Sequence, residues 1–157
     1  MICYISTSFL TLNNFPNLKK DEIIFACVGT DRSTGDSFGP IVGTSLKSLG
    51  YHVVGTLEKP LHAENLKERV DGEILPDKFV IAIDAVVGRP DSVGDIIAKM
   101  APLYPGKGVG KDLGRVGDAV IKGVVCTSSS DISSVRLYSV MEMAKITVQA
   151  ICEKYPD

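Results

Sequence analysis

The sequence predicts one α/β domain, a three-layer α/β/α sandwich built on a mostly parallel sheet. Short continuous apolar runs, typical of strands buried on both faces, alternate with segments whose apolar residues recur at helical spacing. Strands that alternate with helices favour a parallel sheet covered on both sides. The 157 residues correspond to about one domain. We expect an N-terminal extension over residues 1–21 and a single hydrolase-like domain over residues 22–157.

Each element is expected from a local pattern. The first apolar run ends at Gly29, and the third ends on Asp84. Gly50 and the pair Asp71-Gly72 end the first two helices. The N-cap candidates for the last helix are Ser128, Ser129, Ser130 and Asp131. The expected strands span residues 23–28, 51–56, 79–83, 95–100 and 119–126, and the expected helices span residues 38–49, 61–70 and 137–151.

Composition excludes several classes of function. The formal net charge of -2 offers no basic field for nucleic acid. No apolar run approaches the ~20 residues of a membrane span, and no signal-peptide pattern opens the chain. We therefore expect a cytoplasmic protein that binds neither nucleic acid nor membrane. Four scattered cysteines lack metal-ligand spacing and indicate free thiols in a reducing compartment: Cys3, Cys27, Cys126 and Cys152.

Two acids are expected at the carboxyl edge of the sheet, where open α/β sheets bind ligands. Asp84 directly follows an apolar run, and Asp36 lies in the loop before the first helix. Each also fits a cap, since an N-cap carboxylate accepts backbone N–H bonds. Two acids at one edge favour a function, because close carboxylates share one proton. The ionised member can activate a water while the protonated member polarises a carbonyl.

Three other patterns are less specific. Residues 35–39 match the nucleophile elbow G-x-S-x-G, but no histidine follows Asp84, so a Ser-Asp-His triad is excluded. The glycine-rich residues 105–117 fail the Walker and dinucleotide patterns. They are either a flexible turn or a substrate-binding loop whose backbone amides at Gly106, Gly108 and Gly110 line a groove. His62, before the second helix, is either a surface or capping residue or a further substrate-binding group.

Three stretches resemble the spore germination endopeptidases. Residues 29–40 resemble their first signature, in which an aspartate comes seven residues after a glycine and Leu-Gly-Pro follows, although Thr30 replaces the usual Asn. Residues 80–85 resemble the second signature, and residues 105–110 resemble a third, glycine-rich stretch. The hydrogenase maturation proteases share the first pattern, and the whole chain most resembles short sporulation proteins of the YyaC type. The resemblance implies a phosphorylase/hydrolase-like sandwich with Asp36 and Asp84 as catalytic acids.

The resemblance also implies a function. It indicates an aspartic-type endopeptidase that acts on spore proteins, such as small acid-soluble spore proteins, inside the sporulating cell or the spore. One alternative is a non-catalytic sporulation protein that binds a peptide or partner in the same cleft. Another is a metal-dependent maturation protease. The hydrogenase proteases pair their acids with a histidine that binds nickel, and no histidine follows His62. We therefore expect neither a metal ion nor a cofactor.

Overall fold

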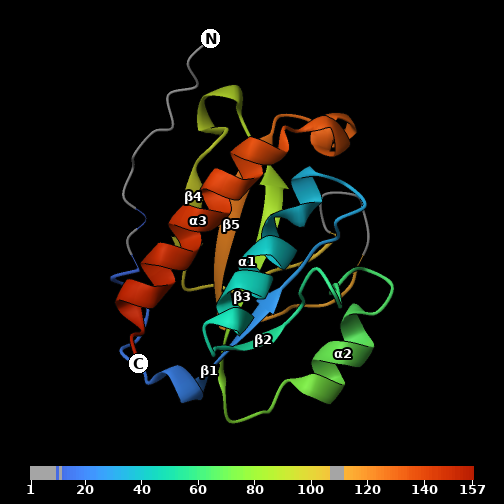
Figure 1. The fold of residues 1–157 in the computed structure, drawn as a ribbon. Coiled ribbons are helices and arrows are strands. Elements are labelled where there is room, and N and C mark those ends of the chain that lie inside the picture. The colour runs from blue at the N-terminus through green and yellow to red at the C-terminus, as the bar shows by residue number, and fades with distance from the viewer. Residues whose placement is uncertain (1–9, 11, 107–111) are drawn as a thin grey trace.

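The computed structural model describes residues 10, 12–106 and 112–157, and its centre is a five-stranded sheet (Figure 1). The strand order is β2-β1-β3-β5-β4. Four strands are parallel and β4 runs antiparallel to β5 at the edge. This arrangement confirms the predicted α/β class and the mostly parallel sheet. The strands are β1 (Ile23–Cys27), β2 (His52–Val54), β3 (Phe79–Val87), β4 (Ile96–Lys99) and β5 (Ala119–Cys126).

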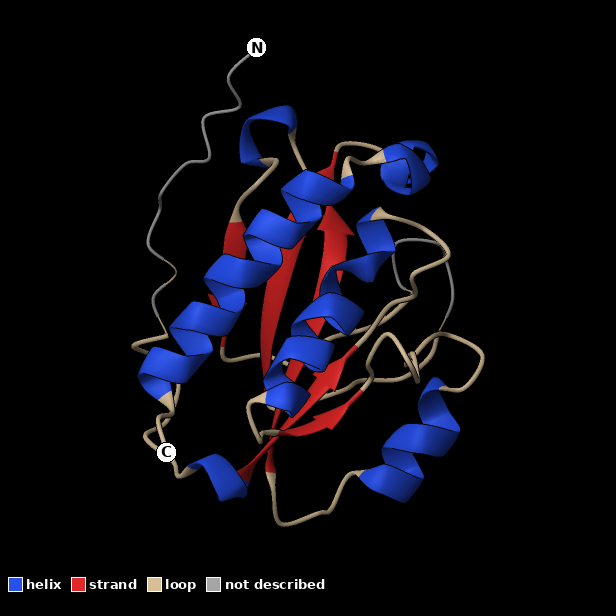
Figure 2. Cartoon of the chain, viewed as in Figure 1, coloured by secondary structure: helices blue, strands red, loops and turns tan. Residues whose placement is uncertain are grey.

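Helices cover both faces of the sheet. α1 (Phe38–Ser48) and α3 (Leu137–Lys154) pack side by side on one face, and α2 (Leu66–Glu73) lies beside β2 (Figure 2). Leu66 of α2 belongs to the apolar cluster on the opposite face from α1 and α3. Short 3₁₀ turns complete the described chain: η1 (Lys20–Glu22), η2 (Gly35–Ser37), η3 (Pro90–Ser92) and η5 (Ser129–Ser134).

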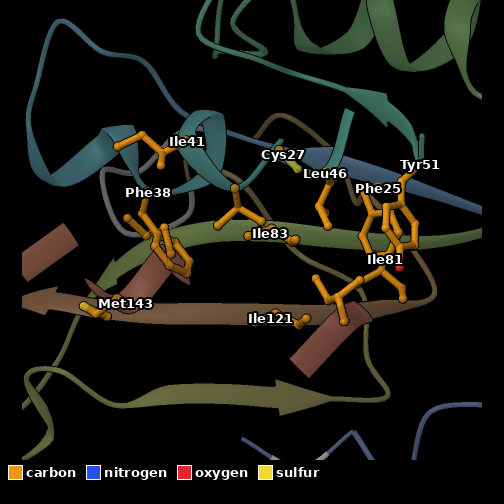
Figure 3. Packing of buried hydrophobic residues seen from close by; sticks show 14 of the residues in the cluster. Phe25, Cys27, Phe38, Ile41, Leu46, Tyr51, Ile81, Ile83, Ile121 and Met143 are labelled. Atoms are coloured by element: carbon orange, nitrogen blue, oxygen red, sulfur yellow. The ribbon is translucent and has the colours of Figure 1, made fainter. Parts of the chain in front are cut away.

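The core divides into two layers because successive strand residues point to opposite faces. Odd-numbered residues of the central strands, such as Phe25, Ile83 and Ile121, pack under α1 and α3 (Figure 3). Even-numbered residues, such as Ala26 and Ala82, face the α2 side. The alternation explains why β1 reads as a continuous apolar run, since both of its faces are buried.

Three predicted element boundaries were wrong. The second helix begins at Leu66 rather than at residue 61, because Leu61 forms a parallel bridge with Val28 and is fully buried in the core. It also continues through the expected stop at residues 71–72 to Glu73. β3 does not end on Asp84, because it stays paired with β5 as far as Val87.

The other boundaries hold more closely. The fifth strand spans the predicted residues, and β4 lies within the predicted span. The second strand is shorter than predicted, at His52–Val54. Ser128 is an N-cap, but of η5 rather than of α3, which begins after Arg136 without a side-chain cap.

The described part of the N-terminal segment packs against the domain. Leu12 and Phe15 are buried in the larger core cluster. The hydroxyl of Tyr155, just after α3, donates a hydrogen bond to the carbonyl of Pro16 at 3.1 Å. Within the described ranges, no helix is long and apolar enough to cross a membrane.

Candidate active site

The strand order places the topological switch point of the sheet between β1 and β3. We call the region beyond the carboxyl ends of these two strands the β1–β3 crevice, after the place where open α/β sheets bind ligands. The chain leaves β1 through α1 and returns as β2 on one side of β1, whereas β3 lies on the other side. In open α/β sheets, ligands bind where neighbouring connections diverge in this way, beyond the carboxyl ends of the strands. Pairing between β1 and β3 stops at Cys27 and Ile83, so Asp84 is the first residue of β3 beyond it. Asp36 lies in η2, directly before α1.

Two glycines allow the start of α1 to press onto these strand ends. A Cβ atom at Gly39 would lie 2.1 Å from the carbonyl oxygen of Val28 and 3.1 Å from that of Ile83. A Cβ atom at Gly29, whose φ is +142°, would lie 2.0 Å from the carbonyl oxygen of Asp36. Side chains are therefore excluded at both positions. The close packing brings the loop that contains Asp36 over the end of β1 and over the part of β3 that contains Asp84.

The two carboxyl groups interact electrostatically. Burial, followed by the charge of Asp36, raises the pKa of Asp84 to about 8, from an ordinary value of 3.8. A backbone hydrogen bond from Ala85 and the charge of Lys122 oppose this rise. Burial also raises the pKa of Asp36, and the nearby hydroxyl of Ser33 opposes that rise. Asp84 therefore carries a proton around neutral pH. The catalytic role of the two acids stays a prediction.

Sequence reasoning missed two neighbours of the acid pair. Ser33 has a buried Oγ that forms no hydrogen bond of normal geometry with the described residues, although it lies near enough to Asp36 to favour its ionised form. Lys122 on β5 is the register partner of Asp84. The available signal for Lys122 was its position as the single charged residue in an apolar run.

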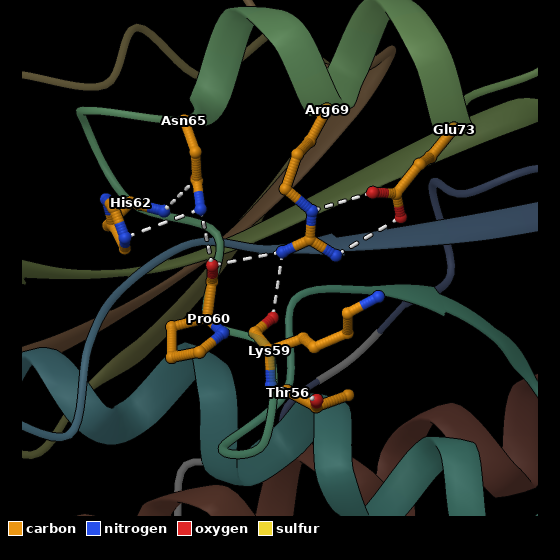
Figure 4. A network of polar contacts seen from close by, with 7 residues as sticks. All are labelled: Thr56, Lys59, Pro60, His62, Asn65, Arg69 and Glu73. Carbon is orange, nitrogen blue, oxygen red and sulfur yellow. Dashed lines mark hydrogen bonds and ion pairs between the residues drawn. The ribbon is translucent and has the colours of Figure 1, made fainter.

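His62 belongs to a hydrogen-bonded turn in front of α2 (Figure 4). Its backbone N–H donates to Oδ1 of Asn65 at 2.9 Å, and its ring Nδ1 accepts from the backbone N–H of Glu64 at 3.3 Å. The guanidinium of Arg69 holds the same turn by donating to the carbonyls of residues 59 and 60 at 2.8 and 3.0 Å. It also forms two hydrogen bonds to Glu73. These contacts make His62 a turn residue, and substrate binding by it stays a prediction.

The position of this turn keeps His62 near the crevice. The backbone N–H of Gly29 donates to the carbonyl of Leu61 at 2.9 Å, so residue 62 follows a segment that pairs with the end of β1. Of the predicted substrate loop, Gly106 lies in a turn with φ +74°. Gly108 and Gly110 lie outside the described residues.

A separate cavity of about 740 Å³ lies between α2 and residues 112–116. Its lining mixes charges of both signs, including Glu64, Lys67, Asp112 and Arg115. Neither Asp36 nor Asp84 contributes to it.

The donor set of the crevice does not fit the nickel or zinc ion of a metal-dependent protease. Within the part of the chain that the structure describes, no three His, Cys, Asp or Glu side chains gather closely enough to hold one. Two carboxylates without imidazole or thiolate are a poor set for nickel or zinc. The steps proposed below use protein groups and water only.

The fold is that of the hydrogenase maturation proteases. HycI from Thermococcus kodakarensis KOD1 superposes with a TM-score of 0.55, at 17% identity over 87% of this chain and 93% of its own. The hydrogenase 2 maturation peptidase from Thaumarchaeota archaeon SCGC_AB-539-E09 gives a TM-score of 0.51, at 18% identity over 84% and 96%. At these identities the likeness shows the fold alone.

Sequence comparison then gives the family. Residues 3–150 match the family described as "Protein of unknown function (DUF1256)", and the chain belongs to it. YyaC from Bacillus subtilis (strain 168) is 44% identical over 138 residues, which cover 82% of this chain and 67% of YyaC. The predicted resemblance to YyaC and to the hydrogenase maturation proteases is thus confirmed.

Proposed function

We propose that the protein is an endopeptidase that hydrolyses a peptide bond with Asp36 and Asp84. The observation that supports this most directly is the raised pKa of Asp84 at the β1–β3 crevice, which burial and then the charge of Asp36 bring to about 8. An acid with this pKa is protonated at neutral pH and is therefore available as a proton donor. The hydrogenase maturation protease fold supports the same class of reaction by analogy.

The proposed reaction assigns one role to each acid. Asp36, in its ionised form, removes a proton from a water molecule as that water attacks the scissile carbonyl carbon. Asp84 donates its proton to the carbonyl oxygen, which gives a tetrahedral diol. As the C–N bond breaks, Asp36 gives the proton taken from water to the leaving nitrogen, and Asp84 takes a proton back from one hydroxyl of the diol. The pair begins and ends with one shared proton, as expected for two close carboxyl groups. The buried hydroxyl of Ser33 lies beside Asp36, where it favours the ionised base.

The proposed substrate is a protein or peptide of the sporulating cell, with small acid-soluble spore proteins as the first candidates. This part of the proposal rests on the resemblance of residues 29–40 and 80–85 to the germination endopeptidase signatures. It implies that the protein acts in the cytoplasm or in the spore interior.

The test compares cleavage by the wild type, Asp36→Asn and Asp84→Asn. Each protein is incubated with extract from sporulating cells of its own source and with purified spore proteins, and new protein N-termini are identified by mass spectrometry. Either variant should lose cleavage by at least about a hundredfold, because each removes one partner of a proton transfer. Asp91→Asn, at an exposed acid outside the crevice, is the matched control and should cleave normally.

The melting temperature of each variant separates lost chemistry from lost folding. Full activity of a folded Asp84→Asn protein would refute the paired-acid reaction. A folded wild type that cleaves nothing would favour the alternative function, a non-catalytic protein that binds a peptide in the same crevice.

A further inference from the structure

Lys122 occupies an unusual place in the sheet. It lies on the inner strand β5, between β3 and β4, and the other seven residues of that strand are buried. Lys122 is partly exposed and carries the only charge of the strand. A lysine inside an otherwise buried strand loses hydration of its ammonium group, so such a position calls for a compensating interaction.

The strand register sets Lys122 beside the acid pair. Lys122 is the Cα partner of Asp84 in the parallel pairing of β5 with β3, and partners in such a ladder point to the same face of the sheet. That face carries Ala82 and Val120, the register partners that precede them. Lys122 is thus the neighbour of Asp84 on β5, and the charge of Asp36, in η2 before α1, also acts on Asp84.

The interaction acts over a distance and not by direct contact. No ion pair within 4.0 Å joins Lys122 to any acid in residues 10, 12–106 and 112–157, and no hydrogen bond from its ammonium occurs there. Its charge nonetheless favours the ionised form of Asp84. Other charged groups beside this part of the sheet are Asp36, before α1, Lys99 on β4, and Asp95, whose carbonyl accepts a hydrogen bond from the N–H of Val124.

The proposed hydrolysis transfers a negative charge from Asp36 to Asp84. At the start the charge is on Asp36, and Asp84 is protonated. As Asp36 takes a proton from water and Asp84 gives one to the substrate, the negative charge passes from Asp36 to Asp84. It therefore arrives on the acid whose register partner is Lys122.

We propose that Lys122 is a positioning residue that stabilises the negative charge formed on Asp84 as this acid gives its proton to the substrate. The proposal rests on the proposed function and adds a residue to it. The ammonium group of Lys122 lies near the carboxyl group that becomes negative in the reaction. It therefore stabilises the transition state more than the ground state, in which Asp84 is neutral. Lys122 acts through Asp84 and does not itself touch the substrate.

The first test is direct titration of Asp84 by ¹³C NMR of its carboxyl carbon, which requires no substrate. Lys122→Met keeps the length and apolar stem of the side chain and removes its charge. Asp84 should then bind its proton about tenfold more tightly, as expected for the loss of a neighbouring charge at a partly screened site. Lys122→Arg should restore the wild-type titration.

Lys99→Met is the matched control. Lys99 has the same charge and faces the same side of the sheet, but its register partner is Val120 rather than Asp84. This variant should leave the titration of Asp84 unchanged. An unchanged titration in Lys122→Met, or an equal change in Lys99→Met, would overturn the proposal even if the protein is an active peptidase.

The second test uses cleavage. Lys122→Met should lower kcat about tenfold and move the alkaline limb of the pH profile to higher pH, because Asp84 becomes a weaker acid. A purely structural role for Lys122 would lower activity without moving that limb, and this result would also refute the proposal. A wild type without peptidase activity would reject the proposed function, and with it any catalytic role for Lys122, whatever the titration shows.

Discussion

Replacing Asp84 by asparagine is expected to stabilise the protein at neutral pH. The pKa of Asp84 is about 8 in the folded state against an ordinary value of 3.8, so the folded protein holds a proton that the unfolded chain has lost between these values. Stability from this group is therefore full below about pH 4 and falls as pH rises towards 8. At pH 7, about three units above the unfolded pKa, the loss reaches at most ~4 kcal/mol, at ~1.4 kcal/mol per unit.

Because Asp84 is partly exposed, screening by solvent reduces this loss of stability. We expect Asp84→Asn to gain about 2 kcal/mol at pH 7, which raises the melting temperature of a domain of this size by about 5 °C. The difference from wild type should become small near pH 4, close to the unfolded pKa of 3.8, because little proton linkage remains there.

Urea unfolding at pH 4, 5.5, 7 and 8 measures this difference. Asp91→Asn, at an exposed carboxylate paired with Arg89, serves as the control and should change the free energy of unfolding by no more than about 0.5 kcal/mol. Equal stability of Asp84→Asn and wild type at pH 7 would refute the raised pKa. A gain of the same size at pH 4 and pH 7 would show that the stabilisation has a cause other than proton linkage.

Two further predictions concern packing and metal binding. Gly39→Ala should lower the free energy of unfolding by about 3 kcal/mol in urea, since its Cβ would lie 2.1 Å from the carbonyl oxygen of Val28, which cannot move aside. Gly72→Ala, near the end of α2 with nothing within 4 Å of the new atom, should instead gain about 0.5 kcal/mol, and a similar loss in both variants would contradict the packing argument. Calorimetric titration with nickel or zinc should show no stoichiometric submicromolar binding; such a site would revive the reading of the chain as a metal-dependent protease.

The local sequence pattern was sufficient to predict the strands of the sheet, but it did not predict where each of them ends. β5 was predicted over the observed residues because a buried strand is a continuous apolar run, and its limits are visible in the sequence. The end of β3 was missed because an acid looks like the end of such a run. Asp84 stays in the strand because β5 continues to pair with β3 beyond it. That pairing joins segments far apart in the chain.

The second helix shows the same limit. Leu61 fits a helical face, but its contact with Val28 removes it from the helix and puts it into the core. The effect of the Lys122 charge on Asp84 could not be predicted from the sequence either, since it depends on the register between β3 and β5. The proximity of Asp36 and Asp84 was predictable, because the rule that places ligands at the carboxyl edge needs only the order of strands and loops.

The tight contacts of Gly29 and Gly39 bear on how relatives of this chain should be compared. Both glycines sit where a Cβ atom would collide with backbone carbonyls, so any chain that folds this way needs them whether or not it is an enzyme. If relatives share the glycines of this loop, that similarity therefore indicates a common fold. Carboxylates at the positions of Asp36 and Asp84 carry separate information, because little of the core depends on them. Members of the family that keep the glycines but lack either acid would be natural examples of the fold without the proposed reaction. Comparing them with this chain would show which residues are kept for the fold and which for the proposed reaction.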